Sequence, residues 1–115
     1  MKTELCKDAE GGETLLFHCP GCGCLHGPIV TAPAGTRPVW RWNGDRDRPT
    51  LSPSIRVQGS VPLTEDEYQR VIRGEKVEPK PLLCHTFVRD GQIEFLPDCT
   101  HALAGKTVPI PDLDA

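Results

Sequence analysis

The fold is set by residues 82–99, which read LLCHTFVRDGQIEFLPDC. At its centre lies Asp90-Gly91, a strong signal for a two-residue hairpin turn, because both residue types tolerate the positive φ that such turns require. Apolar and polar residues alternate on both sides of the turn, as is typical of β-strands with one buried face. The stretch therefore predicts an antiparallel hairpin in which Arg89 pairs with Gln92 and Val88 pairs with Ile93.

This register sends two sets of side chains to opposite faces of the hairpin. One face carries Cys84 and Cys99, close together at the open end, along with most of the large apolar residues. The other face carries His85 and Asp98, which occupy diagonal positions within reach of a hydrogen bond. The sequence thus predicts a thiol-bearing face and a polar face with an imidazole beside a carboxylate.

A second cysteine cluster lies upstream at residues 19–24, which read CPGCGC. Two cysteines three residues apart, separated by small residues, are typical of a zinc knuckle, because a sharp turn lets both thiolates point at one ion. Such a pair supplies half of a tetrahedral site, and the hairpin can supply the rest. We expect a closed, structural Zn²⁺ site whose ligands are Cys19, Cys22, Cys84 and Cys99. Cys24 and then His26 are the alternatives for the fourth ligand.

Other uses of the six cysteines are less favoured. Disulfides need an oxidising compartment, and the first residues, MKTE, show no apolar segment of a secretion signal, so we expect a cytoplasmic protein with reduced thiols. Zinc deaminases and zinc proteases carry His-x-Glu or His-Glu-x-x-His motifs, and neither is present in the sequence. A structural role for the metal is therefore expected.

Composition limits the remaining possibilities. The chain has 115 residues, enough for one domain with a modest core, and 11 glycines and 12 prolines, which favour turns and short strands. Its formal net charge of −3 argues against nucleic acid as a partner, and no apolar run is long enough to cross a membrane. We predict a mostly β, small α+β fold of zinc-stapled antiparallel hairpins.

One short helix is predicted over residues 65–73. Thr64 is a good N-cap, Glu67 completes a capping box, and Gly74 ends the helix. Its apolar face is expected to pack against the rest of the protein. The predicted organisation is a loose lead-in over residues 1–13, a zinc-stapled domain over 14–104 with a helical insertion at about 64–74, and a Pro-rich acidic tail over 105–115.

The polar face of the hairpin lacks only a nucleophile. A carboxylate that orients a histidine is half of a nucleophilic site, and a nearby hydroxyl would complete it. The extended segment TLSPSI at residues 50–55 offers Ser52 and Ser54, which lie two apart on one side of the segment. Spacing alone does not choose between them, and His101 is an alternative to His85 as the base.

Several motifs occur in an order that resembles a known family. They are CPGC at residues 19–22, WRWNG at 40–44, PTLSPSI at 49–55, CH-x-FV-x-DG at 84–91 and DCTHALAG at 98–105. The chain resembles short proteins of tailed phages and prophages, which are related to the serine peptidase component of bacterial ubiquitin-like conjugation operons. The resemblance covers about residues 17–111. In this sequence Cys84 is directly adjacent to His85, and the helix is an insertion.

This resemblance implies roles for particular residues. It implies that Ser54 is the nucleophile and His85 the base, and that Cys19, Cys22 and Cys84 bind zinc, with Cys24 as a further candidate. The expected function is a serine hydrolase, a peptidase acting on a ubiquitin-like or other protein tail, with Asp98 orienting His85. The alternative is a non-catalytic zinc-ribbon-like phage protein that binds a protein partner through Trp40, Trp42 and its proline-rich tail.

Overall fold

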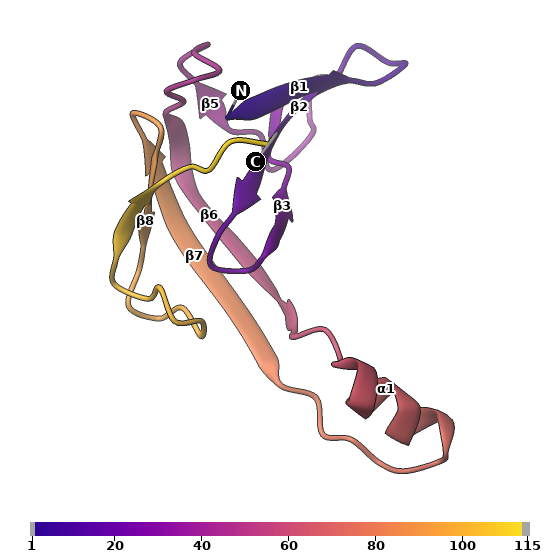
Figure 1. Ribbon diagram of the computed structural model, residues 1–115. Coiled ribbons are helices and arrows are strands. Elements are labelled where there is room, and N and C mark those ends of the chain that lie inside the picture. Colours follow the sequence, from indigo (N-terminus) through magenta and orange to yellow (C-terminus); the bar gives the residue numbers. More distant parts are fainter. Residues whose placement is uncertain (1, 114–115) are drawn as a thin grey trace.

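Two antiparallel sheets make up the body of the protein, which confirms the mostly β prediction (Figure 1). The computed structural model describes residues 2–113. The smaller sheet has the order β1-β2-β3, with β4 also pairing with β2, and the larger has the order β5-β6-β7-β8-β9. The smaller sheet comprises β1 (Thr3–Lys7), β2 (Glu13–Cys19), β3 (Cys24–His26) and β4 (Ile29–Thr31). The larger comprises β5 (Arg41–Trp42), β6 (Leu51–Ser60), β7 (Pro81–Arg89), β8 (Gln92–Phe95) and β9 (Thr107–Pro109).

The β7–β8 hairpin has the predicted register. Arg89 pairs with Gln92 and Val88 with Ile93, around a turn in which Asp90 has φ 50° and Gly91 has φ 76°. The second strand is shorter than predicted, because β8 ends at Phe95. Residues 96–100 still follow β7 through hydrogen bonds to its carbonyl groups, so the chain continues alongside the strand without forming a regular ladder.

The hydrophobic core lies where β2 packs on the inner face of the larger sheet. Alternate residues of β7 face it, so that Cys84, Thr86 and Val88 are buried while His85 and Phe87 are partly exposed. This alternation arises because successive side chains of a strand point to opposite faces of the sheet, and only one face is covered. The buried apolar residues are Leu15, Phe17, Cys19, Leu51, Ile55, Cys84, Val88, Ile93, Phe95, Cys99 and Ile110.

Both ends of the chain are more ordered than predicted. Residues 3–7 form β1, which pairs with β2 along its whole length, and residues 107–109 form β9 on the edge of the larger sheet. Thr3 and Ile110 are fully buried. Residues 3–7 are therefore not a loose lead-in, and residues 107–109 form a strand within the predicted Pro-rich acidic tail, because main-chain pairing at a sheet edge needs no alternating apolar pattern. Met1, Asp114 and Ala115, which belong to the same two segments, lie outside the described residues.

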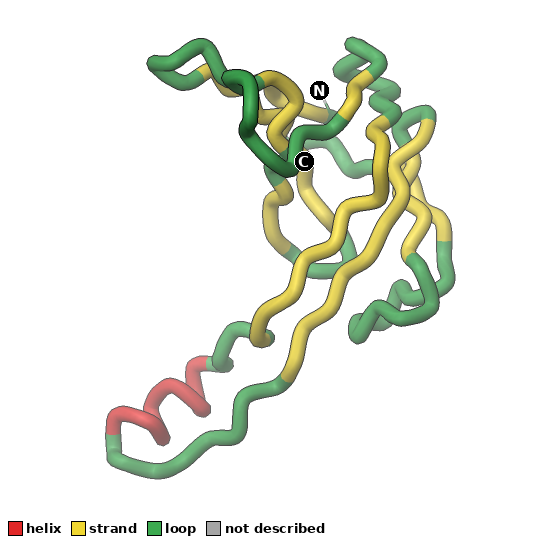
Figure 2. The backbone as a smooth tube through the Cα atoms, turned by 180° about the vertical axis from the view of Figure 1, so that it is seen from behind, coloured by secondary structure: helices red, strands yellow, loops and turns green. Residues whose placement is uncertain are grey.

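The single predicted helix is present as α1 (Glu65–Ile72). Thr64 caps it, and the complete capping box is formed with Glu67. Its packing was predicted wrongly, because α1 lies at the far end of the β6–β7 ribbon, away from both sheets (Figures 1 and 2). Its apolar residues Tyr68, Val71 and Ile72 are exposed. No helix within residues 2–113 is both long enough and apolar enough to cross a membrane.

Candidate functional site

Four possible metal ligands converge between the two sheets. Cys19 at the end of β2, Cys22 in the following turn, His26 in β3 and Cys84 in β7 have ligand atoms within 4.8 Å of one another. The Sγ atoms of Cys19 and Cys84 are 3.8 Å apart. Two sulfur ligands of a tetrahedral zinc ion, each about 2.3 Å from the metal, also lie about 3.8 Å apart. The spacing of this pair therefore fits zinc.

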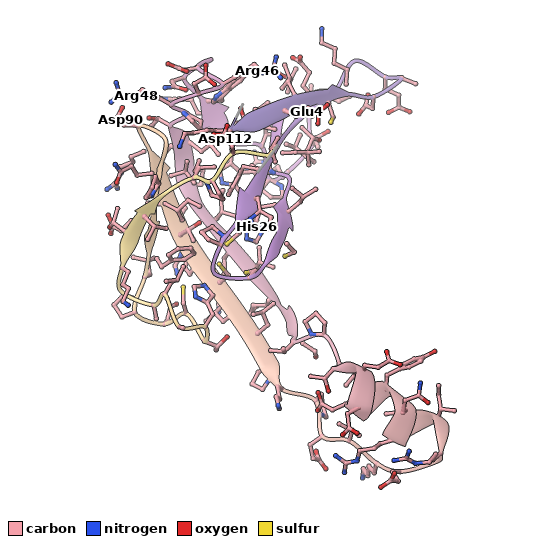
Figure 3. All side chains as sticks on the ribbon, in the orientation of Figure 1. Glu4, His26, Arg46, Arg48, Asp90 and Asp112 are labelled. Atoms are coloured by element: carbon pink, nitrogen blue, oxygen red, sulfur yellow. The ribbon has the colours of Figure 1, made fainter. Side chains whose placement is uncertain are left out.

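His26 is the fourth member of this group. Its Nε2 atom is buried and has no hydrogen-bond partner among the described residues. Figure 3 labels His26 on the smaller sheet, where that sheet approaches the long strands of the larger one. A buried imidazole nitrogen without a partner is costly unless a ligand satisfies it. An imidazole with an unsatisfied buried nitrogen, grouped with three thiols, fits a Cys₃His metal site.

The electrostatics of the three thiols also favour a cation. A hydrogen bond from the Cys84 thiol, helped by the nearby His26, lowers the pKa of Cys19 to about 3. Burial, followed by the neighbouring Cys19 thiolate, raises the pKa of Cys22 to about 12. The Cys19 thiolate and burial also raise the pKa of Cys84. The negative charge on Cys19 thus disfavours ionisation of Cys22 and Cys84, and a divalent cation would allow all three thiols to ionise.

The remaining candidates for the fourth ligand are not members of this group. Cys24 is exposed and pairs with Cys19 across the β2–β3 ladder. Cys99 belongs to a second group of three, with Cys84 and His101, and its Sγ atom hydrogen-bonds with the main chain of His85. The residues that form the four-membered group are thus Cys19, Cys22, His26 and Cys84.

His101 lies on the metal side of the larger sheet, not on its polar face. Its Nε2 is 3.4 Å from Cys84 Sγ, and its Nδ1 accepts a hydrogen bond of 3.2 Å from the main-chain N–H of Leu103. The ring packs directly on Gly21 of the knuckle, where any side chain would collide with it. This contact explains the glycine between Cys19 and Cys22.

On the opposite face, three polar side chains form a continuous series. Ser54 Oγ lies 3.0 Å from His85 Nε2, and His85 Nδ1 lies 3.2 Å from Asp98 Oδ2. The His85 side chain is 26 % exposed and that of Asp98 is 49 % exposed, so the series is open to solvent. Because an ionised carboxylate can only accept hydrogen bonds, Nδ1 carries the proton and Nε2 can accept the proton of the Ser54 hydroxyl.

An irregularity in β6 brings Ser54 to His85. Leu51 pairs with Val88 and Ile55 pairs with Thr86, so residues 52–54 bulge opposite Phe87 alone. A bulge of this kind re-aims side chains, and bulges are common beside active sites. The indole N–H of Trp40 donates a hydrogen bond of 3.3 Å to the carbonyl of Ser54 and so fixes its main chain.

The bulge separates the two candidate serines. Ser52 pairs with Arg41 of β5 and is exposed, whereas Ser54 is half-buried against His85. Sequence reasoning from the residues alone left both open, because the two serines lie two apart in a segment assumed to be regular. The two prolines of the segment signal an irregular strand but do not define its register.

Two hollows flank residues 36–40 beside Ser54, and sequence reasoning missed both. One, of about 420 Å³, is lined by Pro53 and by residues 36–39. The other, of about 200 Å³, is lined by Trp40, Ile55 and Arg56 among others. The two hollows adjoin the residues on either side of Ser54.

Comparison with known proteins identifies the family of the chain. The model of the family described as bacterial ubiquitination-like system serine protease (BubE) matches residues 2–96. This segment includes Ser54, His85 and all four members of the metal group, and it ends two residues before Asp98. No curated protein and no solved structure matches the chain.

Proposed function

The chain belongs to the BubE family of bacterial ubiquitination-like system serine proteases, and from this premise we propose that it is a serine hydrolase. We assign it as a peptidase that cuts the tail of a ubiquitin-like or other protein. The observation that carries the proposal is the series Ser54–His85–Asp98, with contacts of 3.0 Å and 3.2 Å. A hydroxyl, an imidazole and a carboxylate in this order are the parts of a nucleophilic triad.

In the proposed reaction, Ser54 Oγ attacks the carbonyl carbon of the scissile peptide bond. His85 Nε2 takes the hydroxyl proton, and Asp98 stabilises the resulting imidazolium through the Nδ1 proton. When the C–N bond breaks, His85 returns that proton to the leaving amine, and the acyl group stays on Ser54. A water molecule, deprotonated by His85, then attacks the acyl-enzyme, and the proton passes back to Ser54 as the acid leaves.

For the four-membered group we propose a structural Zn²⁺ held by Cys19, Cys22, His26 and Cys84. The unpartnered Nε2 of His26 supports this choice of fourth ligand over Cys99. A bound ion would provide a cross-link between β2, β3 and β7, and four protein ligands leave no position for substrate. The cross-link would hold the inner face of β7 still while its outer face presents His85.

The phage or prophage origin and the location in the host cytoplasm are part of the same proposal. They rest on the sequence resemblance and on six cysteines that the structure leaves unbridged. The partner would be a protein or peptide. Nucleic acid fits poorly with a formal net charge of −3.

The test is labelling with a serine-directed fluorophosphonate. The wild-type chain and its Ser52→Ala variant should both react, whereas Ser54→Ala should not, because Ser54 supplies the one hydroxyl among residues 2–113 that hydrogen-bonds with the His85 ring. Zinc content and circular dichroism of each variant show whether it is folded. Labelling that survives Ser54→Ala and is lost in Ser52→Ala would move the nucleophile by two residues.

A second function is favoured by the exposed apolar residues around α1. Val61, Leu63, Tyr68, Val71 and Ile72 are each at least 40 % exposed, on an arm that no other element covers. Exposed apolar patches of this kind mark interaction sites. Failure of the wild-type chain to react with any fluorophosphonate or to cut any protein would leave a zinc-stapled, non-catalytic interaction module as the better account.

A further inference from the structure

The main chain of His85 lacks a regular strand partner on the side of Asp98. The last paired residues of the β7–β8 ladder are Thr86 and Phe95, and beyond them the His85 carbonyl accepts a hydrogen bond of 2.9 Å from the Leu96 N–H. The N–H group of His85 therefore needs another acceptor. A buried N–H without one would be costly.

Cys99 supplies that acceptor. The His85 N–H donates to Cys99 Sγ at 3.2 Å, and the Cys99 thiol donates to the His85 carbonyl at 3.3 Å. Cys99 is only 8 % exposed, so water competes weakly for these bonds. The thiol thus makes the pair of hydrogen bonds that a main-chain residue of a neighbouring strand would make.

We propose that Cys99 is a positioning residue, which clips the loop bearing Asp98 to the strand bearing His85. The inference rests on the proposed triad, since Asp98 directly precedes Cys99 and reaches His85 Nδ1 at 3.2 Å. Two further bonds fix the same loop, from Thr100 N–H to the Leu83 carbonyl at 2.9 Å and from Leu83 N–H to Thr100 Oγ1 at 3.0 Å. The bonds of Cys99 fix the residue that directly follows Asp98, and so they set the distance from the Asp98 carboxylate to the His85 imidazole.

In this role Cys99 is a neutral thiol and not a metal ligand. A metal-bound thiolate has no proton to donate, whereas Cys99 lies where it can donate to the His85 carbonyl. The neighbouring possible ligand His101 already has partners at both ring nitrogens. His26, in contrast, has an unpartnered Nε2 and belongs to the metal group with Cys19, Cys22 and Cys84.

The variants Cys99→Ala and Cys99→Ser separate the clip from a ligand and from a mere core residue. Serine can both donate and accept at this position, whereas alanine can do neither. The matched control is Cys6→Ala, which removes an exposed cysteine far along the chain from either site. Each variant is measured for bound zinc, for the NMR resonance of the His85 Nδ1 proton, assigned by its loss in His85→Gln, and for the rate of fluorophosphonate labelling.

We expect one zinc per chain in every variant. Cys99→Ala should lose the His85 Nδ1 proton resonance by faster exchange with water and label roughly 10- to 100-fold more slowly, as for other groups that orient a reacting side chain. Cys99→Ser and Cys6→Ala should keep the resonance and stay within about threefold of wild type, since a hydroxyl restores both bonds.

Three results would overturn the inference. The first is loss of zinc from Cys99→Ser, and the second is an unchanged resonance and labelling rate in Cys99→Ala. The third is loss of the His85 Nδ1 proton resonance in Cys99→Ser. This third result tests the inference even if the alanine variant does not fold. A wild-type chain that shows the expected resonance changes but no labelling would support the clip and overturn the hydrolase proposal.

Discussion

Cys84 and His85 are neighbours in β7, yet they belong to regions with opposite properties. Cys84 is 1 % exposed, lies between the two sheets and joins three other possible metal ligands. The His85 side chain is 26 % exposed and lies between Ser54 and Asp98 on the outer face. The comparison shows how one strand can serve two purposes, because successive side chains point to opposite faces of a sheet.

The two regions differ in what a lost side chain should cost. On the inner face, binding of the proposed metal would be coupled to folding, since the four residues come together only when both sheets are in place. On the outer face, a half-exposed hydroxyl or carboxylate contributes little to folding and much to any reaction. Variants on the two faces should therefore separate stability from activity.

The largest effect is expected from Cys84→Ser. Loss of a ligand weakens metal binding that is itself folding free energy, so the free energy of unfolding should fall by several kcal/mol, about 3 or more. Chelation of the wild-type protein should have a comparable effect. Calorimetry and metal analysis measure both quantities, with Cys6→Ser as the control for thiol loss. A Cys84→Ser protein that keeps its zinc and its melting temperature would contradict the assignment.

Ser54→Ala should give the opposite pattern. Hydrolysis should be lost because the attacking oxygen is gone, while the free energy of unfolding changes by about 1 kcal/mol at most. Zinc content should stay at one per chain. A Ser54→Ala variant that releases zinc or melts far below wild type would show that the two faces are not independent.

Asp98→Asn should have a smaller effect on the reaction than loss of the nucleophile. An amide cannot stabilise the imidazolium as a carboxylate does, so we expect kcat to fall by roughly 10²- to 10⁴-fold, with KM little changed. Steady-state kinetics on a cleaved protein or peptide measures both. A fall in kcat of less than about threefold would mean that Asp98 is only a surface hydrogen-bond partner.

The smallest effect is expected from removal of the α1 arm. Ser60 and Pro81 are paired where the arm begins, so residues 61–80 can be replaced by an Asn-Gly turn. Since no residue of α1 is buried, zinc content and fluorophosphonate labelling should stay within about twofold of wild type. A large fall in either would show that the arm supports the body of the protein.

Local patterns predicted the hairpin and its two faces correctly. The Asp90-Gly91 turn fixed the register, and the period of two then placed Cys84 inward and His85 outward. The diagonal placement of His85 and Asp98 followed from the same register, although β8 itself ends earlier. The capping box of α1 was also predicted, because it depends on residues only three apart.

Features that depend on contacts between distant segments were predicted less well. His26 was only the second alternative for the fourth ligand, because it joins the metal group through packing of the smaller sheet on β7, which no local pattern encodes. The bulge at residues 52–54 depends on pairing with β7, and α1 was expected to pack although its ribbon carries it away from the core. The roles of Ser54, His85, Asp98 and the four metal ligands remain predictions.

The central claim is that one chain carries a structural zinc and a reactive serine on opposite faces of the same strands. Native mass spectrometry of the fluorophosphonate-treated protein, followed by peptide mapping, tests both parts in one sample. The account predicts a single species with one zinc and one phosphonyl group, the latter on Ser54. A species that has no zinc, carries no label, carries the label on another residue or loses zinc when Ser54 reacts would contradict it.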